Sequence, residues 1–311
     1  MITRRTFFLL LFLGVHLGLG ATPGAPQNIR VLTVGNSFSQ NATHYLADLA
    51  KASGDAVFVR EADVGGASLA LHWSKVEAFE KDPADPLGRY PTHKSLREEL
   101  SGSHWDFVTF QQASIDSHDV ATYRPFAKEL SDYIRLYAPD AILLLHETWE
   151  YRVDDPRFST AAAKPAKPGE PKSQDEMYEG LSKAYAAIAQ ELGVRRLPVG
   201  DAFHLANHDP QWGYHAPATS FDPLHAQPGE LPDQTHSLNA GWSWKKQPDG
   251  ASKPVMDGHH ANLAGEYLGA CVWYEVLFGK NVEENSFTPS GLDPDYARFL
   301  RATAHRTVKG A

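Results

Sequence analysis

Short apolar runs that alternate with segments of helical spacing constrain this fold more than any other feature of the sequence. Five such runs predict strands, at residues 29–35, 56–64, 106–110, 140–146 and 195–200. Helices are expected over 39–53, from 68 onward, and over 122–138, 175–193 and 260–279. Apolar strands separated by helices are typical of parallel sheets that are covered on both faces. We therefore expect an α/β fold with a mainly parallel five-stranded sheet.

The first 25 residues have the pattern of an export signal. Arg4 and Arg5 precede an apolar run from Phe7 to about Leu19, and small residues follow that run. Charged, apolar and small-residue regions in this order are typical of a signal peptide. The paired arginines fit either a Sec or a twin-arginine signal. We therefore expect a periplasmic or secreted protein.

Charge and cysteine content exclude several classes of protein. The 311 residues include 29 Lys+Arg and 38 Asp+Glu, for a formal net charge of −9, and contain no basic run. Such a chain is a poor binder of nucleic acid. Cys271 is the only cysteine, which excludes an internal disulfide framework and a cysteine-based zinc site. After the signal, no apolar stretch reaches the roughly 20 residues that span a membrane, so no stable membrane insertion is expected.

Residues 26–311 are expected to form one domain with two loop insertions. The segment 152–174 is rich in Pro, Ala and Lys, which is typical of a mobile loop. The segment 205–256 contains three of the seven tryptophans and has little periodicity. A loop of that length is usually functional or disordered. Its aromatic content favours an ordered segment that covers the site.

Two polar segments contain residues suited to nucleophilic catalysis. Ser37 directly follows the first predicted strand, and Ser39 is a plausible N-cap of the next helix. This position is at the carboxyl edge of the sheet, where open α/β sheets bind ligands. Asp257 and His260 lie three residues apart, on what is expected to be a loop before the last helix. That spacing lets the carboxylate hold one imidazole nitrogen while the other faces a serine hydroxyl. An ordinary turn and a capping loop are the alternatives.

Together these segments resemble the SGNH/GDSL hydrolase superfamily, and most closely a bacterial branch with a Gly-Asn-Ser-Phe-Ser first block. Members carry a nucleophilic serine after the first strand and Asp-x-x-His before the last helix. The motifs of the branch occur here in order, as GNSFS at 35–39, QQ at 111–112, DGHH at 257–260 and GEYL at 265–268. The resemblance covers roughly residues 29–279, less the insertions. It implies a flavodoxin-like, three-layer α/β/α sandwich, the SGNH hydrolase fold.

The resemblance also implies a catalytic triad and part of an oxyanion hole. By position, Ser37 would be the nucleophile, His260 the general base and Asp257 the residue that orients the base. The second block of the superfamily is a glycine whose N–H faces the oxyanion. Gly66 fits that role best, with Gly65 as the alternative, and the Ser37 N–H would be a second donor. No cofactor is implied.

Two blocks depart from the usual pattern of the superfamily. Asn36 stands where the first block usually has Asp, and the third block lacks the Asn whose amide is the third oxyanion donor. Counting along the third strand, that Asn would fall at Ile115. Gln111 or Gln112 could supply an amide instead, and we prefer Gln112, with Gln111 in contact with the substrate. A polar strand end without a role is the alternative. A missing donor can lower the rate on the order of 10²–10³-fold.

Other polar residues are weaker candidates. Glu147 and Trp149 follow the fourth strand and are expected to line the site and contact a sugar or ester, unless they belong to a solvated loop. Position 150 is Glu, so the segment is not the H-E-x-x-H motif of a zinc protease. His204 and His208 have the spacing of metal ligands on a helix. A proline that closely follows makes a stable helix there doubtful.

These features predict an exported SGNH-type carboxylic ester hydrolase, with an acylated and foremost an acetylated carbohydrate as the expected substrate. A lipase or thioesterase of the same type is one alternative. The missing third-block Asn motivates another, a non-catalytic glycan-binding protein on the same fold. A metal-dependent hydrolase that uses the His-rich segments is a third. The expected partner is a small-molecule or glycan ester, with no nucleic acid, and the oligomeric state is left open.

Overall fold

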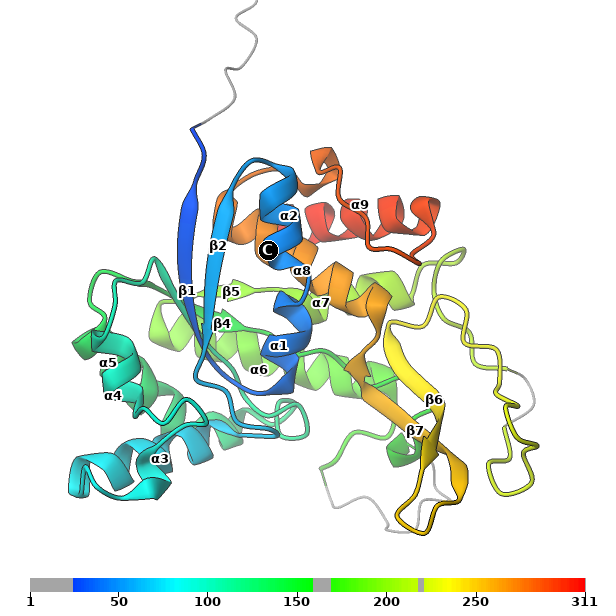
Figure 1. The fold of residues 1–311 in the computed structure, drawn as a ribbon, viewed down its shortest axis with the longest axis horizontal. Helices are drawn as coiled ribbons and strands as arrows, with labels where there is room; N and C mark the ends of the chain where they lie inside the picture. Colours follow the sequence, from blue (N-terminus) through cyan, green and yellow to red (C-terminus); the bar gives the residue numbers. More distant parts are fainter. Residues whose placement is uncertain (1–24, 159–168, 218–220, 311) are drawn as a thin grey trace, which may run out of the picture.

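The computed structural model describes residues 25–158, 169–217 and 221–310 (Figure 1). The predicted export signal therefore lies outside the described residues except for its last position. Most of the Pro-, Ala- and Lys-rich part of the segment 152–174 lies outside them as well. The described chain otherwise covers every strand and helix predicted from the sequence.

A five-stranded parallel sheet confirms the predicted α/β class. Its strands lie in the order β2–β1–β3–β4–β5, and every neighbouring pair is parallel. The chain first steps from β1 to β2 on one side, and then to β3 on the other side of β1. The topological switch point, where such sheets bind ligands, therefore lies between the carboxyl ends of β1 and β3. The bounds are β1 (Asn28–Val34), β2 (Ala56–Glu61), β3 (Phe107–Phe110), β4 (Ile142–His146) and β5 (Arg195–Leu197).

Helices cover both faces of this sheet (Figure 1). One layer contains α1 (Ser37–Thr43), α2 (Leu46–Ala52), α7 (Val199–Asn207), α8 (Leu263–Phe278) and α9 (Pro294–Gly310). The other contains α3 (Leu69–Lys81), α4 (Leu96–Ser101), α5 (Phe126–Tyr137) and α6 (Gln174–Leu192). Short 3₁₀ turns are η1 (Pro86–Gly88), η2 (Val120–Tyr123), η3 (Pro156–Phe158) and η4 (Val282–Glu284).

Helix α8 is apolar on all sides because it is buried on all sides. Fourteen of its residues, from Ala264 to Phe278, are buried, and they include Cys271. It packs against α1, α2, α7 and α9. Burial also raises the pKa of the Cys271 thiol, as expected of a structural cysteine. Within the described residues, no helix is long and apolar enough to cross a membrane.

Several predicted helix boundaries were wrong. The helix expected over 39–53 is two helices, α1 and α2, separated at Tyr45. Asn36 rather than Ser39 caps α1, because its side chain accepts from the N–H of Phe38. The helix expected over 122–138 is the turn η2 followed by α5, with Pro125 between them. Helices α4, α7 and α9 were not predicted.

The insertion 205–256 contains regular structure that its composition did not indicate. An antiparallel hairpin of β6 (Asn239–Lys246) and β7 (Ser252–Ala261) stands apart from the main sheet (Figure 1). The segment with Asp257 and His260, expected to be a loop, is the end of β7. It therefore has a fixed backbone, which holds both side chains in register next to α1.

Candidate active site

A tight turn after β1 places Ser37 at the carboxyl edge of the sheet. Ser37 is half-buried and is the first residue of α1. Gly35 precedes it, and a Cβ there would collide with the Ser39 hydroxyl and with the Gln111 side chain. This close approach requires glycine at position 35. The turn thereby fixes the direction in which the Ser37 side chain leaves the sheet.

Ser37, His260 and Asp257 form one continuous hydrogen-bonded line. The Ser37 Oγ lies 2.9 Å from His260 Nε2, and His260 Nδ1 lies 2.9 Å from Asp257 Oδ2. The backbone N–H of His260 also donates to Asp257 Oδ1, at 3.1 Å. Such an arrangement lets the imidazole remove a proton from the serine while the carboxylate holds the ring.

The contacts of Asp257 determine its charge. Burial raises the pKa of Asp257, but hydrogen bonds from the side chain and backbone of His260 lower it. The nearby imidazole of His259 lowers it further. The net pKa lies well below the usual range of an aspartate, so the carboxylate is ionised at every pH at which a histidine titrates.

His259 is a second imidazole on the same carboxylate. Its Nδ1 lies 3.2 Å from Asp257 Oδ1, and its ring centroid lies 4.1 Å from that of His260. Burial lowers the pKa of His259, Asp257 raises it, and His260 lowers it again. The net pKa of His259 is lowered, so its imidazole favours the neutral form. His259 therefore does not neutralise the charge of Asp257, which can act on His260.

A cavity of about 240 Å³ opens directly over Ser37 and His260. Gly66 lines it with φ of +67°, a conformation that glycine adopts without strain. In the part of the chain that the structure describes, neither the Ser37 N–H nor the Gly66 N–H has a hydrogen-bond acceptor. Both remain available to a ligand. Sequence reasoning missed several other residues that line the cavity, among them Ser114, Tyr151 and Arg157.

Gln111 supports the Ser37 turn and is not exposed to a ligand. It is fully buried, and its Nε2 donates to Asn36 Oδ1 at 2.9 Å. Its Oε1 accepts from His146 Nδ1, at 2.7 Å, and from the Ser39 hydroxyl. Asn36 in turn donates to the carbonyl of Ala67, at 3.0 Å. The predicted substrate contact of Gln111 is therefore wrong. Gln111 instead holds Asn36, whose side chain links the turn of Ser37 to the loop of Gly66.

The side-chain amide of Gln112 is hydrogen-bonded inside the protein, so the prediction that it donates to the oxyanion is wrong. Its Nε2 donates to the carbonyl oxygen and the hydroxyl of Thr122, at 2.9 and 3.1 Å. Its Oε1 accepts from the N–H of Leu69 and of Ala113. Strand alternation placed Gln111 and Gln112 on opposite faces but did not show that both faces are closed.

Glu147 and Trp149 also lie inside the protein, contrary to the prediction that they contact substrate. Both side chains are fully buried. Glu147 accepts from Arg196, at 2.9 Å, and burial together with the neighbouring Asp201 raises the pKa of Glu147 to about 8. The covering helix α7 was not predicted, which is why these residues were expected at a surface.

Trp149 connects the segment of Ser37 to the segment of His260. Its ring packs on Phe38, with centroids 4.2 Å apart, and stacks on Phe203, with centroids 4.5 Å apart. Its indole N–H donates to the carbonyl of His259, at 2.9 Å. It thus ties the start of α1 to β7, so its role is to position Ser37 relative to His260.

His204 and His208 lie on α7 and at its C-cap, so the doubt about a helix there was misplaced. Each histidine already has other contacts. Both ring nitrogens of His208 are bonded, one to Asp175 and the other to the carbonyl of His204. The ring of His204 stacks on Tyr178, with centroids 3.5 Å apart. The ring nitrogens of both histidines and the carboxylate of Asp175 lie close enough together to hold a metal ion, and Nδ1 of His204 is buried without a hydrogen-bond partner among the described residues.

Two buried histidines predict that the protein loses stability in acid. Burial lowers the pKa of His146 to about 3 and that of His72 to about 4, against about 6.5 in an unfolded chain. Between about pH 4 and 6.5, these two histidines are therefore protonated in the unfolded state and neutral in the folded state. Their contribution to stability is complete above pH 6.5 and is lost as the pH falls from there toward 4.

The His146→Gln variant isolates one of these protons. Its free energy of unfolding, measured in urea between pH 4 and 7, should depend less steeply on pH than that of the parent. The difference in slope should approach one proton, or about 1.4 kcal/mol per pH unit. Gln can still donate to Gln111, which limits other losses. Parallel curves for parent and variant would show that His146 is protonated in the folded state over the same pH range as in the unfolded state.

Several known proteins are similar to this chain. A family described as a domain of unknown function, DUF4886, matches residues 30–200. A crystal structure of a DUF4886 family protein from Bacteroides uniformis is similar with a TM-score of 0.68 and 25% identity, covering 91% of this chain and 95% of that one. No curated protein matches the sequence.

Two solved structures with names from the SGNH/GDSL group are more distant. A putative SGNH hydrolase from Slackia heliotrinireducens has a TM-score of 0.47 and 23% identity, covering 80% of this chain and 98% of that one. A putative GDSL-like lipase from Parabacteroides merdae has a TM-score of 0.45 and 13% identity, with 83% and 99% covered.

The sheet order and the family match agree with the α/β/α fold that the SGNH/GDSL resemblance implied. The family match includes the turn of Ser37, the Gly66 loop and all five strands of the sheet. It extends over more than half of the sequence. The chain therefore belongs to the DUF4886 family.

Proposed function

We propose that the protein is a serine hydrolase that cleaves carboxylic esters through Ser37, His260 and Asp257. One observation carries this proposal, the unbroken line from Asp257 Oδ2 through His260 to Ser37 Oγ with two separations of 2.9 Å. Ser37 lies in one segment and the other two residues lie in a second segment, about 220 positions further along the chain. The two segments meet beside a cavity at the switch point of the sheet. A solvated turn and a capping loop would have no reason to align in this way.

The proposed reaction follows acyl transfer to serine. The Ser37 oxygen attacks the ester carbonyl as His260 Nε2 takes the hydroxyl proton. Asp257, ionised and bonded to Nδ1, stabilises the imidazolium. The tetrahedral intermediate collapses when His260 protonates the leaving alcohol, which breaks the ester bond. Water then repeats these steps on the acyl-serine and releases the carboxylic acid.

Two backbone donors are available to the oxyanion of that intermediate. The N–H groups of Ser37 and Gly66 both border the catalytic cavity, and neither has an acceptor among the described residues. The bond from Asn36 to Ala67 holds the Gly66 loop against the Ser37 turn. This prior positioning matters, because donors already in place cost no reorganisation during the reaction.

The hydroxyl of Ser114 is the best candidate for the third donor. Ser114 follows β3, on the side of the switch point opposite Ser37, and it lines the same cavity. Its Oγ lies 2.9 Å from the hydroxyl of Tyr151. Burial raises the pKa of Tyr151, so this phenol keeps its proton and can donate it to Ser114. The hydrogen of Ser114 is then free to point to the oxyanion.

Removal of the Ser114 hydroxyl should slow the chemical step. We expect Ser114→Ala to lower kcat about 10²-fold with little change in KM, as for the loss of one oxyanion donor. Ser114→Thr retains a hydroxyl and should recover most of the activity. Steady-state kinetics on p-nitrophenyl acetate measure both. Equal kcat values for the alanine variant and the parent would remove Ser114 from the oxyanion hole.

Our preferred substrate is an acylated, foremost an acetylated, carbohydrate outside the cytoplasm. The catalytic cavity of about 240 Å³ suits a small acyl group. The export pattern of residues 1–25 supports a periplasmic or secreted location. A long-chain lipid is less favoured, because the polar side chains of Ser114, Tyr151 and Arg157 line the cavity.

The general proposal is tested by hydrolysis of p-nitrophenyl acetate and butyrate by the mature chain, with and without a chelator. We expect turnover that the chelator does not change, and faster cleavage of acetate than of butyrate. Loss of activity on chelation, with recovery on adding a divalent metal, would favour a metal-dependent hydrolase instead. Folded protein that cleaves neither these esters nor acetylated glycans would favour a binding protein on this fold.

A further inference from the structure

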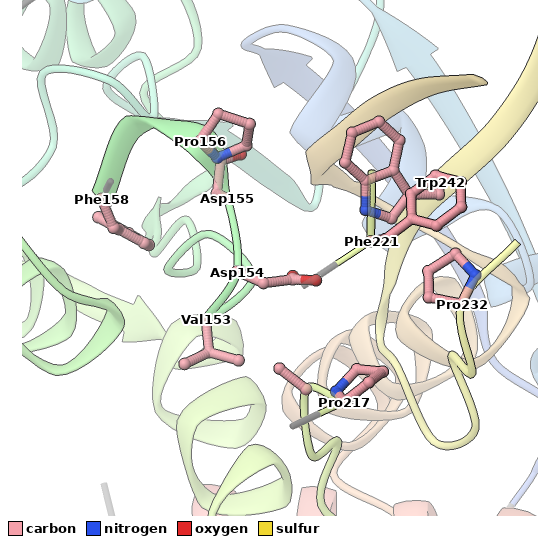
Figure 2. Close-up of a pocket in the computed structure, with 10 residues that line it drawn as sticks. Val153, Asp154, Asp155, Pro156, Phe158, Pro217, Phe221, Pro232 and Trp242 are labelled. Atoms are coloured by element: carbon pink, nitrogen blue, oxygen red, sulfur yellow. The ribbon is translucent and has the colours of Figure 1, made fainter. Parts of the chain in front are cut away.

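A second cavity, of about 370 Å³, has no part in the proposed acyl transfer (Figure 2). Its walls come from the segment after β4 and from the insertion 205–256. Pro156 and Phe158 line this cavity, whereas Arg157 between them lines the catalytic cavity. The two cavities therefore share the turn η3 as a common wall.

The wall of the second cavity is tied to the strand of the triad. Trp242, which lines it, lies on β6 and pairs with Met256 on β7, while the preceding Gly241 pairs with Asp257. The side chain of Gln234 bonds the backbone of Trp242 twice, accepting from its N–H at 2.7 Å and donating to its carbonyl at 3.0 Å. Trp242 is thus held in a fixed position relative to Asp257.

The cavity combines aromatic faces with two carboxyl side chains, Asp154 and the more deeply buried Asp155. The rings of Trp242 and Phe221 lie edge to face, with centroids 5.1 Å apart, on one side of it (Figure 2). Asp154 points toward the middle of the cavity. The carboxylate receives two bonds from the buried Arg152, at 2.6 and 2.9 Å, and one from the hydroxyl of Tyr214, at 3.2 Å. One of its roughly four acceptor positions remains for a ligand.

These features select among classes of ligand. An apolar chain would cover the Asp154 carboxylate without giving it a hydrogen bond, which is costly. A cation would gain little from Asp154, because Arg152 already balances its charge, and little from Asp155, because burial raises the pKa of that carboxyl group. An anion would meet the carboxylate of Asp154 directly. A neutral sugar ring satisfies both parts of the cavity, because its C–H face can pack on the indole of Trp242 while a hydroxyl donates to Asp154.

We infer that this cavity is a saccharide subsite, which binds a sugar unit of the substrate next to the one that carries the ester. The inference rests on the proposed function for its link to the ester, but the binding of sugar can be measured without catalysis. The volume of about 370 Å³ lies within the ordinary range of small-molecule sites. Trp242 is then the stacking platform, and Asp154 orients the ring.

The test measures sugar binding in a chain that cannot turn substrate over. Xylotriose, cellotriose and chitotriose are titrated by calorimetry into Ser37→Ala, and into the same chain with Trp242→Ala, Trp242→Phe or Trp244→Ala. Trp244 is a matched control, because it lies two residues further along β6, and its indole donates to the carbonyl of Glu230 instead of lining the cavity. Thermal unfolding midpoints show whether each variant is folded.

We expect at least one of the three sugars to bind, and Trp242→Ala to weaken its binding at least tenfold. Trp242→Phe should lose less, and Trp244→Ala should change the affinity less than twofold. Absence of binding by all three sugars, or equal losses at Trp242 and Trp244, would overturn the subsite. If the parent still cleaves p-nitrophenyl acetate in that case, the proposed function stands. Sugar binding that depends on Trp242, in a parent without esterase activity, would contradict the hydrolase and keep the subsite.

Discussion

Ser37→Ala should abolish ester hydrolysis, with kcat lowered about 10⁴–10⁶-fold. Removal of a nucleophilic serine has effects of this size, because the remaining donors and binding groups supply only a small part of the acceleration. Here the loss removes the atom that lies 2.9 Å from His260 Nε2. Release of p-nitrophenol from the acetate ester measures it, and the burst that reports the acyl-serine should disappear as well.

The control for this variant is Ser74→Ala. Ser74 is exposed on α3, where its hydroxyl bonds only to the carbonyl of Leu71. Its replacement should leave the activity unchanged and exclude an effect of serine removal in general. If folded Ser37→Ala retains more than about a tenth of the parent kcat, Ser37 is not the nucleophile. A phosphonate that labels the parent but not the Ser37→Ala chain gives a second readout by mass spectrometry.

The predictable parts of the fold are those in which burial makes a whole run of residues apolar. The strand β1 has four buried residues in succession at its carboxyl end, and its apolar run marks it as a central parallel strand. Helix α8 is almost wholly apolar for the same reason. Such segments are recognisable because every position meets the core.

The hairpin and α7 could not be predicted from periodicity. The strand β6 alternates only at its start, since most of its later residues are half-buried or exposed. Its stability comes from the pairing with β7 and from the side chain of Gln234, which are tertiary contacts. Without the hairpin, the sequence could only place Asp257 and His260 on a loop.

In the site, too, residues within short motifs were predicted, whereas residues that meet only through tertiary contacts were not. Ser37, Asp257, His260 and Gly66 were predicted because each belongs to a short motif at a strand end. Ser114 and Tyr151 were missed, because their hydroxyls meet across 37 residues of sequence and no motif joins them.

The errors at Gln112, Glu147 and Trp149 have one physical cause. Each is polar or aromatic and lies at or after the carboxyl end of a strand, where exposure to the site is a reasonable expectation. In the structure all three are buried, and their polar atoms bond inside the protein. Whether a strand end faces a ligand depends on what packs above it.

Asp257→Asn should lower kcat about 10⁴-fold while the fold is retained. An Asn amide can donate to Nδ1 of His260, which favours the tautomer that carries its hydrogen on Nε2. That nitrogen can then no longer accept the proton of Ser37, and the imidazolium loses its counter-charge. Asp249→Asn, in the turn of the same hairpin, is the control, because Asn can still accept from the N–H of Ala251 as Asp249 does.

The pH profile of the parent tests the ionisation of Asp257 independently of any substitution. Its pKa lies well below the usual range, because the hydrogen bonds from His260 outweigh the effect of burial. Asp257 therefore stays charged over the whole range of the profile. On the acid side, kcat/KM should fall with a slope of one in log–log form, since only one group of the proposed triad then gains a proton. A slope of two, or equal kcat values for Asp257→Asn and the parent, would show that this carboxylate does not hold the base in its active form.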